Sequence, residues 1–333
     1  MAQRVAYGAL AIAVLVLLFI QDVIIAKQSI ETAGPLGELL RRGSLIPLLF
    51  IVVLLRGAVE LNRIFRAKEI RPHSAFAYLM ILVLLLTPWL SAAGWLGADV
   101  RDLEGLFWQL IALMATVLGA GLLCVLRGHP RGALLDMAAT LLMVFYVGFL
   151  GSFGLQLRCG RDIPGQEGAW LLLITLLVTK ASDIGAYFLG TMMGRHKLIP
   201  GISPAKSVEG AVGGLLGSAL VAVLIASAGA MSWLTGTGDG AMVAILSDFI
   251  RSFGIRNDPT SMSPIVRALI FGIALSAAGQ IGDLVESCFK RDSGVKDSGR
   301  LIPHYGGILD MIDSPVFTMP VAWFLLTKVW NVV

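Results

Sequence analysis

Residues 75–97, AFAYLMILVLLLTPWLSAAGWLG, contain no charged side chain and are long enough to cross a lipid bilayer as a helix. Their apolar residues follow one another continuously, which is typical of a spanning helix and not of a barrel strand. The chain has eight more apolar stretches of this kind, at residues 6–26, 44–62, 105–126, 133–155, 168–190, 208–230, 264–287 and 313–331. The sequence therefore predicts an all-α, polytopic integral membrane helical bundle with about nine transmembrane helices.

The overall composition supports this interpretation. Of the 333 residues, 56% are hydrophobic and only 14% are charged, whereas soluble domains carry about 25% charged residues. The three cysteines, Cys124, Cys159 and Cys288, are too widely spaced to indicate a disulfide framework or a zinc site. The net charge of +4 is modest, and we expect membrane lipids, and no nucleic acid, among the partners.

The basic residues of the loops predict the orientation in the membrane. Four loops are rich in Lys and Arg, namely residues 63–73, 127–132, 191–207 and 288–312, and the loops between them are poorer. The positive-inside rule places these four loops and the N-terminus in the cytoplasm. The first loop, residues 27–43, has three basic residues and fits this pattern least well.

Two predicted cytoplasmic regions, residues 180–210 and 279–314, carry carboxylates that extend into apolar runs. Asp183 lies inside the sixth run, and Asp283 and Glu286 lie inside the eighth. An intramembrane carboxylate is costly and indicates a functional site, although a residue at a helix end can instead reach interfacial water. Helical spacing places Asp283, Glu286, Ser287 and Lys290 on one face.

Further carboxylates and cations accompany Asp283. Asp310 and Asp313 are one helical turn apart, and they either complement the helix dipole or, with Asp283, offer oxygen ligands for Mg²⁺. A group of basic residues could neutralise an anionic substrate, or could reflect topology alone: Lys290, Arg291, Lys296 and Arg300.

The stretch SPAKS, residues 203–207, precedes another apolar run. Ser203 or Ser207 could cap the following helix, with Lys206 near its positive end, where phosphate binds well. A simple N-cap explains the stretch equally well. Mg²⁺ ligands, lysines and a helix N-terminus together indicate phosphoryl or nucleotidyl transfer to a membrane-embedded substrate.

These two regions resemble the conserved blocks of the phosphatidate cytidylyltransferases, also called CDP-diacylglycerol synthases. The matching residues of the second block, which follow the GDL at 282–284, are Ser287, Phe289, Lys290, Arg291, Lys296, Asp297, Ser298, Gly299, Ile302, Pro303, Gly306, Gly307, Ile308, Asp310 and Asp313. Those of the first block are Asp183, Gly185, Ala186, Tyr187, Gly194, His196, Lys197, Leu198, Ser203, Pro204, Lys206, Ser207, Glu209 and Gly210, and Glu60 in the second span also agrees. The close resemblance covers about residues 180–315. We accordingly divide the chain into N-terminal transmembrane helices, residues 1–167, and a C-terminal catalytic region, residues 168–333, with the signature at 279–314.

The resemblance implies the transfer of the cytidylyl group of CTP to phosphatidate, giving CDP-diacylglycerol and pyrophosphate for phospholipid synthesis, with Mg²⁺ required. It implies metal ligation by Asp283 and Asp310, helped by Asp313 and Asp297. It assigns Lys206, Lys290 and Lys296 to the triphosphate or to the phosphate of phosphatidate, and Asp183, Ser203 and Ser207 to the nucleotide. Arg291 and Arg300 add positive charge for the anionic substrates. The expected location is an inner or plasma membrane, with the N-terminus and the active site facing the cytoplasm. A second cation and a homodimer are left open.

The signature departs from the family pattern at two places. The family usually has Pro-Gly-His-Gly-Gly where this chain has His304 and Tyr305 after the proline, and it usually has Arg where this chain has Met311. Methionine cannot form the bidentate contact of arginine with phosphate, although Arg300 could compensate. Two other functions stay open: a related CTP-dependent transferase acting on an isoprenoid or another lipid alcohol, and a non-catalytic membrane protein or transporter. A transporter would place its polar residues near mid-membrane in broken helices, whereas here they gather toward one face.

Overall fold

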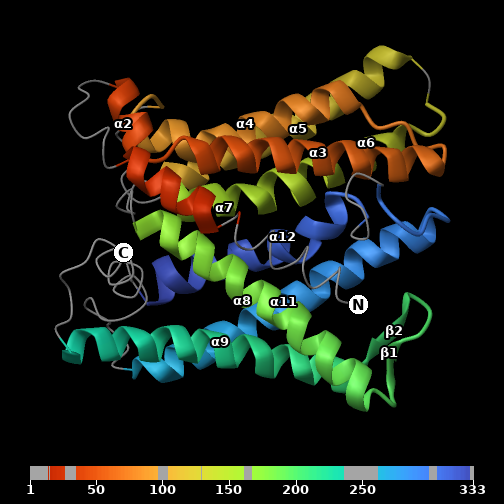
Figure 1. Ribbon diagram of the computed structural model, residues 1–333. Helices are drawn as coiled ribbons and strands as arrows, with labels where there is room; N and C mark the ends of the chain where they lie inside the picture. The colour runs from red at the N-terminus through yellow and green to blue at the C-terminus, as the bar shows by residue number, and fades with distance from the viewer. Residues whose placement is uncertain are drawn as a thin grey trace. The chain divides into compact units, whose positions relative to one another are not determined.

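The computed structural model describes residues 14, 16–26, 35–96, 104–128, 130–160, 167–235, 262–299 and 306–330 (Figure 1). These residues form two compact units, each described here by itself. Unit 1 comprises Met1–Ala169 and Phe289–Ile312, and unit 2 comprises Trp170–Cys288 and Asp313–Val333. Three helices, α8 (Glu167–Met193), α11 (Pro264–Asp292) and α12 (Leu309–Trp323), contribute residues to both units.

Within the described part of the chain, eight helices are long and apolar enough to span a membrane. They are Leu45–Ala67, Ser74–Ala92, Leu106–Arg127, Ala133–Cys159, Glu167–Met193, Val208–Ser227, Pro264–Asp292 and Leu309–Val329. The first predicted span appears as a shorter apolar helix, Val16–Ala26, and its beginning lies outside the described residues. The all-α polytopic membrane bundle is thus confirmed, and the protein is a multi-pass membrane protein.

Unit 1 is built around helix α4. Its elements are α2 (Pro35–Arg41), α3 (Leu45–Ala67), α4 (Ser74–Ala92), α5 (Glu104–Arg127), α6 (Ala133–Met143), the π-helical turn η2 (Val144–Phe149) and α7 (Leu150–Cys159). Helix α4 packs against α3, α5, α7 and η2, and Figure 1 shows α3, α4 and α5 running side by side. Apolar side chains such as Leu54, Leu61, Ile81 and Leu84 are completely buried there. The helices α6 and α7 form one span, Ala133–Cys159, because the π-helical turn η2 between them widens the helix locally without ending it.

A buried ion pair joins the short apolar helix Val16–Ala26 to α7. Asp22 and Arg158 are both 0% exposed, and the Nη2 atom of Arg158 lies 2.6 Å from Oδ2 of Asp22. The other carboxylate oxygen of Asp22 accepts hydrogen bonds from the backbone amides of Ser44, Leu45 and Ile46. Asp22 therefore caps the N-terminus of α3 from a neighbouring helix and balances the charge of Arg158.

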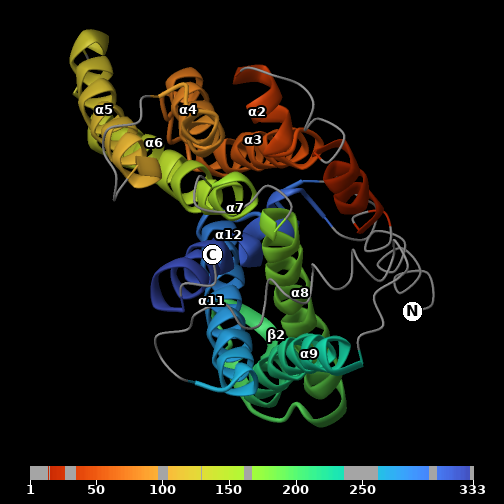
Figure 2. The same cartoon turned by 90° about the vertical axis from the view of Figure 1, so that its left-hand side faces the viewer.

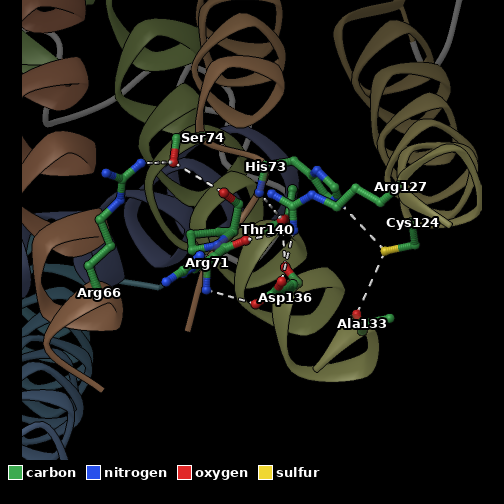
Figure 3. Close-up of polar contacts among 10 residues, drawn as sticks. Arg66, Arg71, His73, Ser74, Cys124, Arg127, Ala133, Asp136 and Thr140 are labelled. Carbon is green, nitrogen blue, oxygen red and sulfur yellow. Dashed lines mark hydrogen bonds and ion pairs between the residues drawn. The ribbon is translucent and has the colours of Figure 1, made fainter. Parts of the chain in front are cut away.

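A polar network connects the start of α4 to the last turns of α5 and to α6 (Figure 3). The backbone amide of His73 donates to Oγ1 of Thr140, and Nε2 of His73 lies 3.4 Å from Sγ of Cys124. Arg127 contacts the carboxylate of Asp136 at 2.9 Å. Partial burial and the nearby Arg127 charge hold the pKa of His73 below its ordinary value of 6.5, against the opposite influence of Asp136.

The lowered pKa of His73 predicts how the stability of the folded protein depends on pH. The pKa of His73 is about 6.5 in the unfolded chain and lower in the folded protein, so between these two values only the unfolded chain binds the proton. The free energy of unfolding is therefore unaffected by His73 above about pH 6.5 and decreases as the pH falls below it. We expect His73→Gln to flatten the loss of thermal stability of the detergent-solubilised protein between about pH 7.5 and pH 5.5. Equal losses in the variant and the parent protein would contradict this assignment.

Unit 2 contains helices α8 (Glu167–Met193) and α9 (Val208–Thr235), the strands β1 (Lys197–Ile199) and β2 (Ser203–Ser207), and the π-helical turn η3 (Phe324–Val329), besides most of α11 and α12. The two strands form an antiparallel hairpin between α8 and α9. Helices α8 and α9 cross closely in both Figure 1 and Figure 2. At the crossing, a Cβ atom on Gly185 would overlap the carbonyl oxygen of Gly213, and one on Gly213 would lie 2.6 Å from that of Gly185. These glycines therefore serve close helix packing in lipid.

Candidate active site

The signature residues of unit 1 form a compact polar cluster. Nζ of Lys290, at the end of α11, lies 2.5 Å from Oδ1 of Asp310, in the first turn of α12. The other oxygen of Asp310 accepts hydrogen bonds from Oγ and the backbone amide of Ser298 and from the backbone amide of Gly307. Asp310 thus orders the signature segment and holds the Lys290 ammonium group. These contacts join the end of α11, the segment around Ser298 and the start of α12 within unit 1.

Local backbone geometry explains how Asp310 reaches these amides. Gly306 has a φ of +86°, a conformation that glycine adopts at little cost. A Cβ atom on Gly306 would lie 2.6 Å from Oδ2 of Asp310, so the segment passes close to the carboxylate. The glycines of the signature therefore allow the backbone to wrap around the start of α12.

Unit 2 holds a second cluster of charged residues. Nζ of Lys206, in β2, lies 2.6 Å from Oδ2 of Asp283 in α11, and Oγ of Ser287 lies 3.5 Å from Oδ1 of Asp283. In α8, Nζ of Lys180 lies 2.9 Å from Oδ2 of Asp183. Both pairs are partly exposed as side chains, although Nζ of Lys206 itself is buried.

Asp313 belongs to the same unit and is nearly buried, with 6% of its surface exposed. Oδ1 accepts a hydrogen bond from the backbone amide of Ser314. The charges that act most strongly on its carboxylate are those of Asp283 and Lys180. Helices α11 and α12 approach closely here, because a Cβ atom on Gly282 would overlap the carbonyl oxygen of Asp313. Asp283 and Asp313 thus belong to one charged cluster of unit 2, together with Lys206 and Lys180.

Ser207 and Ser203, both in the hairpin, have different structural roles. Oγ of Ser207 accepts a hydrogen bond from the backbone amide of Gly210 and so caps α9, as one of the two alternatives predicted. Ser203 instead lies in β2, paired with Ile199 of β1. Glu209 accepts hydrogen bonds from the backbone and the ring of His196, which fixes the start of the hairpin against α9.

The remaining predicted site residues lie on the surface or outside the described residues, apart from Glu286. Arg291, Lys296 and Asp297 are exposed at the end of α11 and in the segment that follows. Arg300, like His304 and Tyr305, lies outside the described residues. Glu286, which was placed on the same helix face as Asp283, is completely buried.

The carboxylates of Asp283, Asp313 and Asp310 differ in how well they suit Mg²⁺. In the parts of the chain that the structure describes, no three His, Cys, Asp or Glu side chains lie close enough together to hold a metal by themselves. Mg²⁺ is usually bound by one or two carboxylates and completed by water and substrate phosphates, so the Asp283–Asp313 pair has a suitable donor set. Asp310 already accepts four hydrogen bonds, which use its acceptor positions.

Two residues that belong to or contact these clusters have no role predicted from the sequence. They are Lys180, which pairs with Asp183, and Glu60, whose Oε2 lies 3.1 Å from Oγ of Ser298 and which matches the family in the second span. The signal for Lys180 was available, because it lies three residues before Asp183 on a helix, a spacing that favours ion pairs. The signal for Glu60 was its position as a carboxylate inside an apolar span.

Known proteins of one family are similar to this chain over most of its length. The model of the cytidylyltransferase family matches residues 34–329. A phosphatidate cytidylyltransferase of Staphylococcus saprophyticus is 34% identical over 294 residues, which cover 87% of this chain and 93% of the relative. The protein of the same name from Staphylococcus haemolyticus is 32% identical over 290 residues, with the same coverage of both chains. One from Staphylococcus aureus is 38% identical over 198 residues, which cover 60% of this chain and 62% of the relative.

The match thus extends from the second apolar helix to the last, and includes both polar clusters. The resemblance that was seen in the signature residues is confirmed over most of the chain. This protein belongs to the cytidylyltransferase family.

Proposed function

We infer that this protein transfers the cytidylyl group of CTP to phosphatidate, giving CDP-diacylglycerol and pyrophosphate. Relatives named phosphatidate cytidylyltransferase align with 87% of the chain. The observation that carries the inference is the pairing of signature lysines with signature carboxylates, Lys206 with Asp283 and Lys290 with Asp310. These pairs present exchangeable ammonium groups on a membrane protein, as a reaction between anionic phosphates in lipid requires.

The chemistry needs little from the protein beyond charge and alignment. A phosphate oxygen of phosphatidate is already anionic near neutral pH, so it can attack the α-phosphorus of CTP without a strong general base. A new bond forms from this oxygen to the α-phosphorus, and the bond from the α-phosphorus to the bridging oxygen breaks, so that pyrophosphate leaves with the electron pair. The enzyme must screen the repulsion of the anions and hold the attack in line.

We assign Lys206 and Lys290 to this screening. Each lysine can exchange its carboxylate partner for a phosphate oxygen, and the carboxylate keeps the ammonium group in place when no substrate is bound. Arg291, at the end of α11, and Lys296, in the segment that follows, are exposed and can attract an anionic headgroup over a longer distance. Asp183, Ser203 and Asp297 keep the substrate and helper roles that the resemblance implies, as predictions.

Mg²⁺ is the proposed cofactor. Asp283 and Asp313 would hold it, and the phosphates of CTP would complete its coordination. The ion would neutralise charge that develops on the transferred group and on the leaving pyrophosphate. Asp310 as a further ligand stays a prediction, since the contacts described above assign it first to Lys290, Ser298 and Gly307.

We further propose that the site faces the cytoplasm. The basic loops that carry the signature support this orientation through the positive-inside rule, and CTP is a soluble nucleotide. The acyl chains of phosphatidate would remain among the helices, with only the phosphate in contact with the charged residues. Formation of a homodimer stays a prediction.

The test is an assay of the purified protein with radiolabelled CTP, Mg²⁺ and phosphatidate. We expect a labelled CDP-lipid and pyrophosphate, both dependent on phosphatidate. A parallel reaction contains a prenyl alcohol in place of phosphatidate. It distinguishes the proposed function from that of a CTP-dependent transferase acting on a lipid alcohol, because only the latter would label the alcohol. The proposal is contradicted if no labelled CDP-lipid or pyrophosphate forms in response to phosphatidate.

A further inference from the structure

Glu60 lies in α3, far along the chain from the signature, and its side chain is completely buried. A carboxylate inside a spanning helix is costly unless other groups satisfy it. Oγ of Ser298 lies 3.1 Å from Oε2 of Glu60 and shares its single proton between Glu60 and Asp310, and the backbone amide of Leu309 donates a hydrogen bond to Oε2 at 2.9 Å. Arg56 supplies a cation 4.0 Å from Oε1. Both hydrogen-bond donors to Glu60 therefore belong to the signature.

Ser298 connects Glu60 to the charged pair of unit 1. Its Oγ atom lies within hydrogen-bond distance of two carboxylates, 3.1 Å from Oε2 of Glu60 and 2.7 Å from Oδ2 of Asp310. Asp310 in turn contacts Lys290 through its other oxygen. A continuous series of contacts thus runs from α3 through Ser298 and Asp310 to the ammonium group of Lys290.

Two signature glycines accommodate the Glu60 carboxylate. A Cβ atom on Gly299 would lie 2.7 Å from Oε1 of Glu60, and one on Gly307 would overlap Oε2. The signature backbone therefore passes directly against the carboxylate on both sides. This explains in physical terms why side chains are missing at positions 299 and 307.

We propose that Glu60 is a positioning residue for the reaction. It anchors the signature segment and the first turn of α12 to α3, and through Ser298 it fixes Asp310 and hence Lys290. Glu60 touches no substrate in this role, and it acts by the placement of its acceptor oxygen. The role in catalysis rests on the proposed function, whereas the anchoring itself can be measured without any assay of activity.

Conservative variants separate this role from the charge of Glu60. In Glu60→Gln the side-chain oxygen can still accept both hydrogen bonds, because the amide nitrogen would take the place of Oε1, which has no hydrogen-bond partner among the described residues. In Glu60→Asp the carboxylate is one methylene shorter and withdraws from Ser298 and Leu309. We expect Glu60→Gln to stay within about threefold of the parent kcat and Glu60→Asp and Glu60→Ala to lose about 10²-fold, as small misplacements do.

A double-mutant cycle tests whether Glu60 acts through Ser298. If it does, the combined Glu60→Ala and Ser298→Ala protein should be little slower than the worse single variant, because both changes interrupt the same series of contacts. Asn62 offers a matched control on the same helix, since it is nearly buried and bonds Tyr78 and Ser74 outside the signature. Asn62→Ala should lower the melting temperature without a comparable loss of kcat.

Hydrogen exchange gives a readout that does not depend on activity. In Glu60→Ala, and in Glu60→Asp if the alanine variant does not fold, amide exchange in peptides from residues 293–312 should accelerate at least about tenfold, and in Asn62→Ala it should not. The anchoring is overturned if exchange is unchanged. The positioning role is overturned if Glu60→Gln is as slow as Glu60→Ala, or if the two single losses multiply in the double variant. A parent protein without activity but with faster exchange in the variants would refute the proposed function and leave the anchoring intact.

Discussion

Asp283→Asn should lower the rate of CDP-lipid formation by about 10²–10³-fold, which is a loss of transition-state stabilisation of about 3–4 kcal/mol. The change keeps the shape of the side chain and removes its charge. It takes away the anion that holds Lys206, whose Nζ lies 2.6 Å away, and one of the two carboxylates proposed for Mg²⁺. The initial rate at saturating CTP and phosphatidate measures the effect.

Asp292→Asn is the matched control for this prediction. Asp292 lies at the end of the same helix and also pairs with a lysine, at 2.5 Å from Nζ of Lys68, but it is largely exposed. An exposed pair contributes little, so the rate should stay within about twofold of the parent. If Asp283→Asn retained a rate similar to that of Asp292→Asn, Asp283 would have no role in charge screening or metal binding.

The concentration of Mg²⁺ distinguishes the two roles of Asp283. If the residue is a ligand, the variant should need more Mg²⁺ for half-maximal rate than the parent, because a neutral amide oxygen is a weaker ligand for a hard cation. If it only holds Lys206, the dependence on Mg²⁺ should be unchanged and the KM for CTP should rise. Both results support a place in the site, and they separate the ligand from the lysine anchor.

Arg158→Met should lower the free energy of unfolding by about 3–5 kcal/mol. The change leaves the carboxylate of Asp22 completely buried without the guanidinium group that donates to it through Nε and Nη2. The backbone amides at the start of α3 still donate to the carboxylate, but they do not neutralise it. The melting temperature in detergent, together with unfolding in a graded series of denaturing detergent, measures the loss.

Two comparisons make this result specific. Removing both charges, in Asp22→Asn with Arg158→Met, should recover part of the stability, because no unpaired charge then remains buried. Arg127→Met interrupts a partly exposed pair with Asp136 in the same unit, and it should cost about 1 kcal/mol or less. Equal losses in Arg127→Met and Arg158→Met would show that burial of the Asp22–Arg158 pair has no special importance.

Several features of the site were predictable from the sequence and others were not. The signature residues indicated Lys290, Asp310, Lys206 and Asp283 as charged groups of one reaction, and their resemblance to the family is confirmed by comparison over most of the chain. The choice between Ser203 and Ser207 as a helix cap required the structure, because both precede α9 and only Ser207 lies at its first turn. The partners of each lysine also required the structure.

The sequence by itself determined the fold class, because lipid offers no hydrogen bonds to the backbone and a long apolar run must therefore form a helix. It also determined which side chains are charged within those runs. Only the tertiary structure decided which charges meet: Asp22 with Arg158, Lys206 with Asp283, and Glu60 with Ser298. The physical reason is that these partners are far apart in the chain, so their contact depends on how the helices pack and not on any local spacing of residues. Glu60 shows this most clearly, since a single acidic residue in an apolar helix indicates a partner but does not say which segment will supply it.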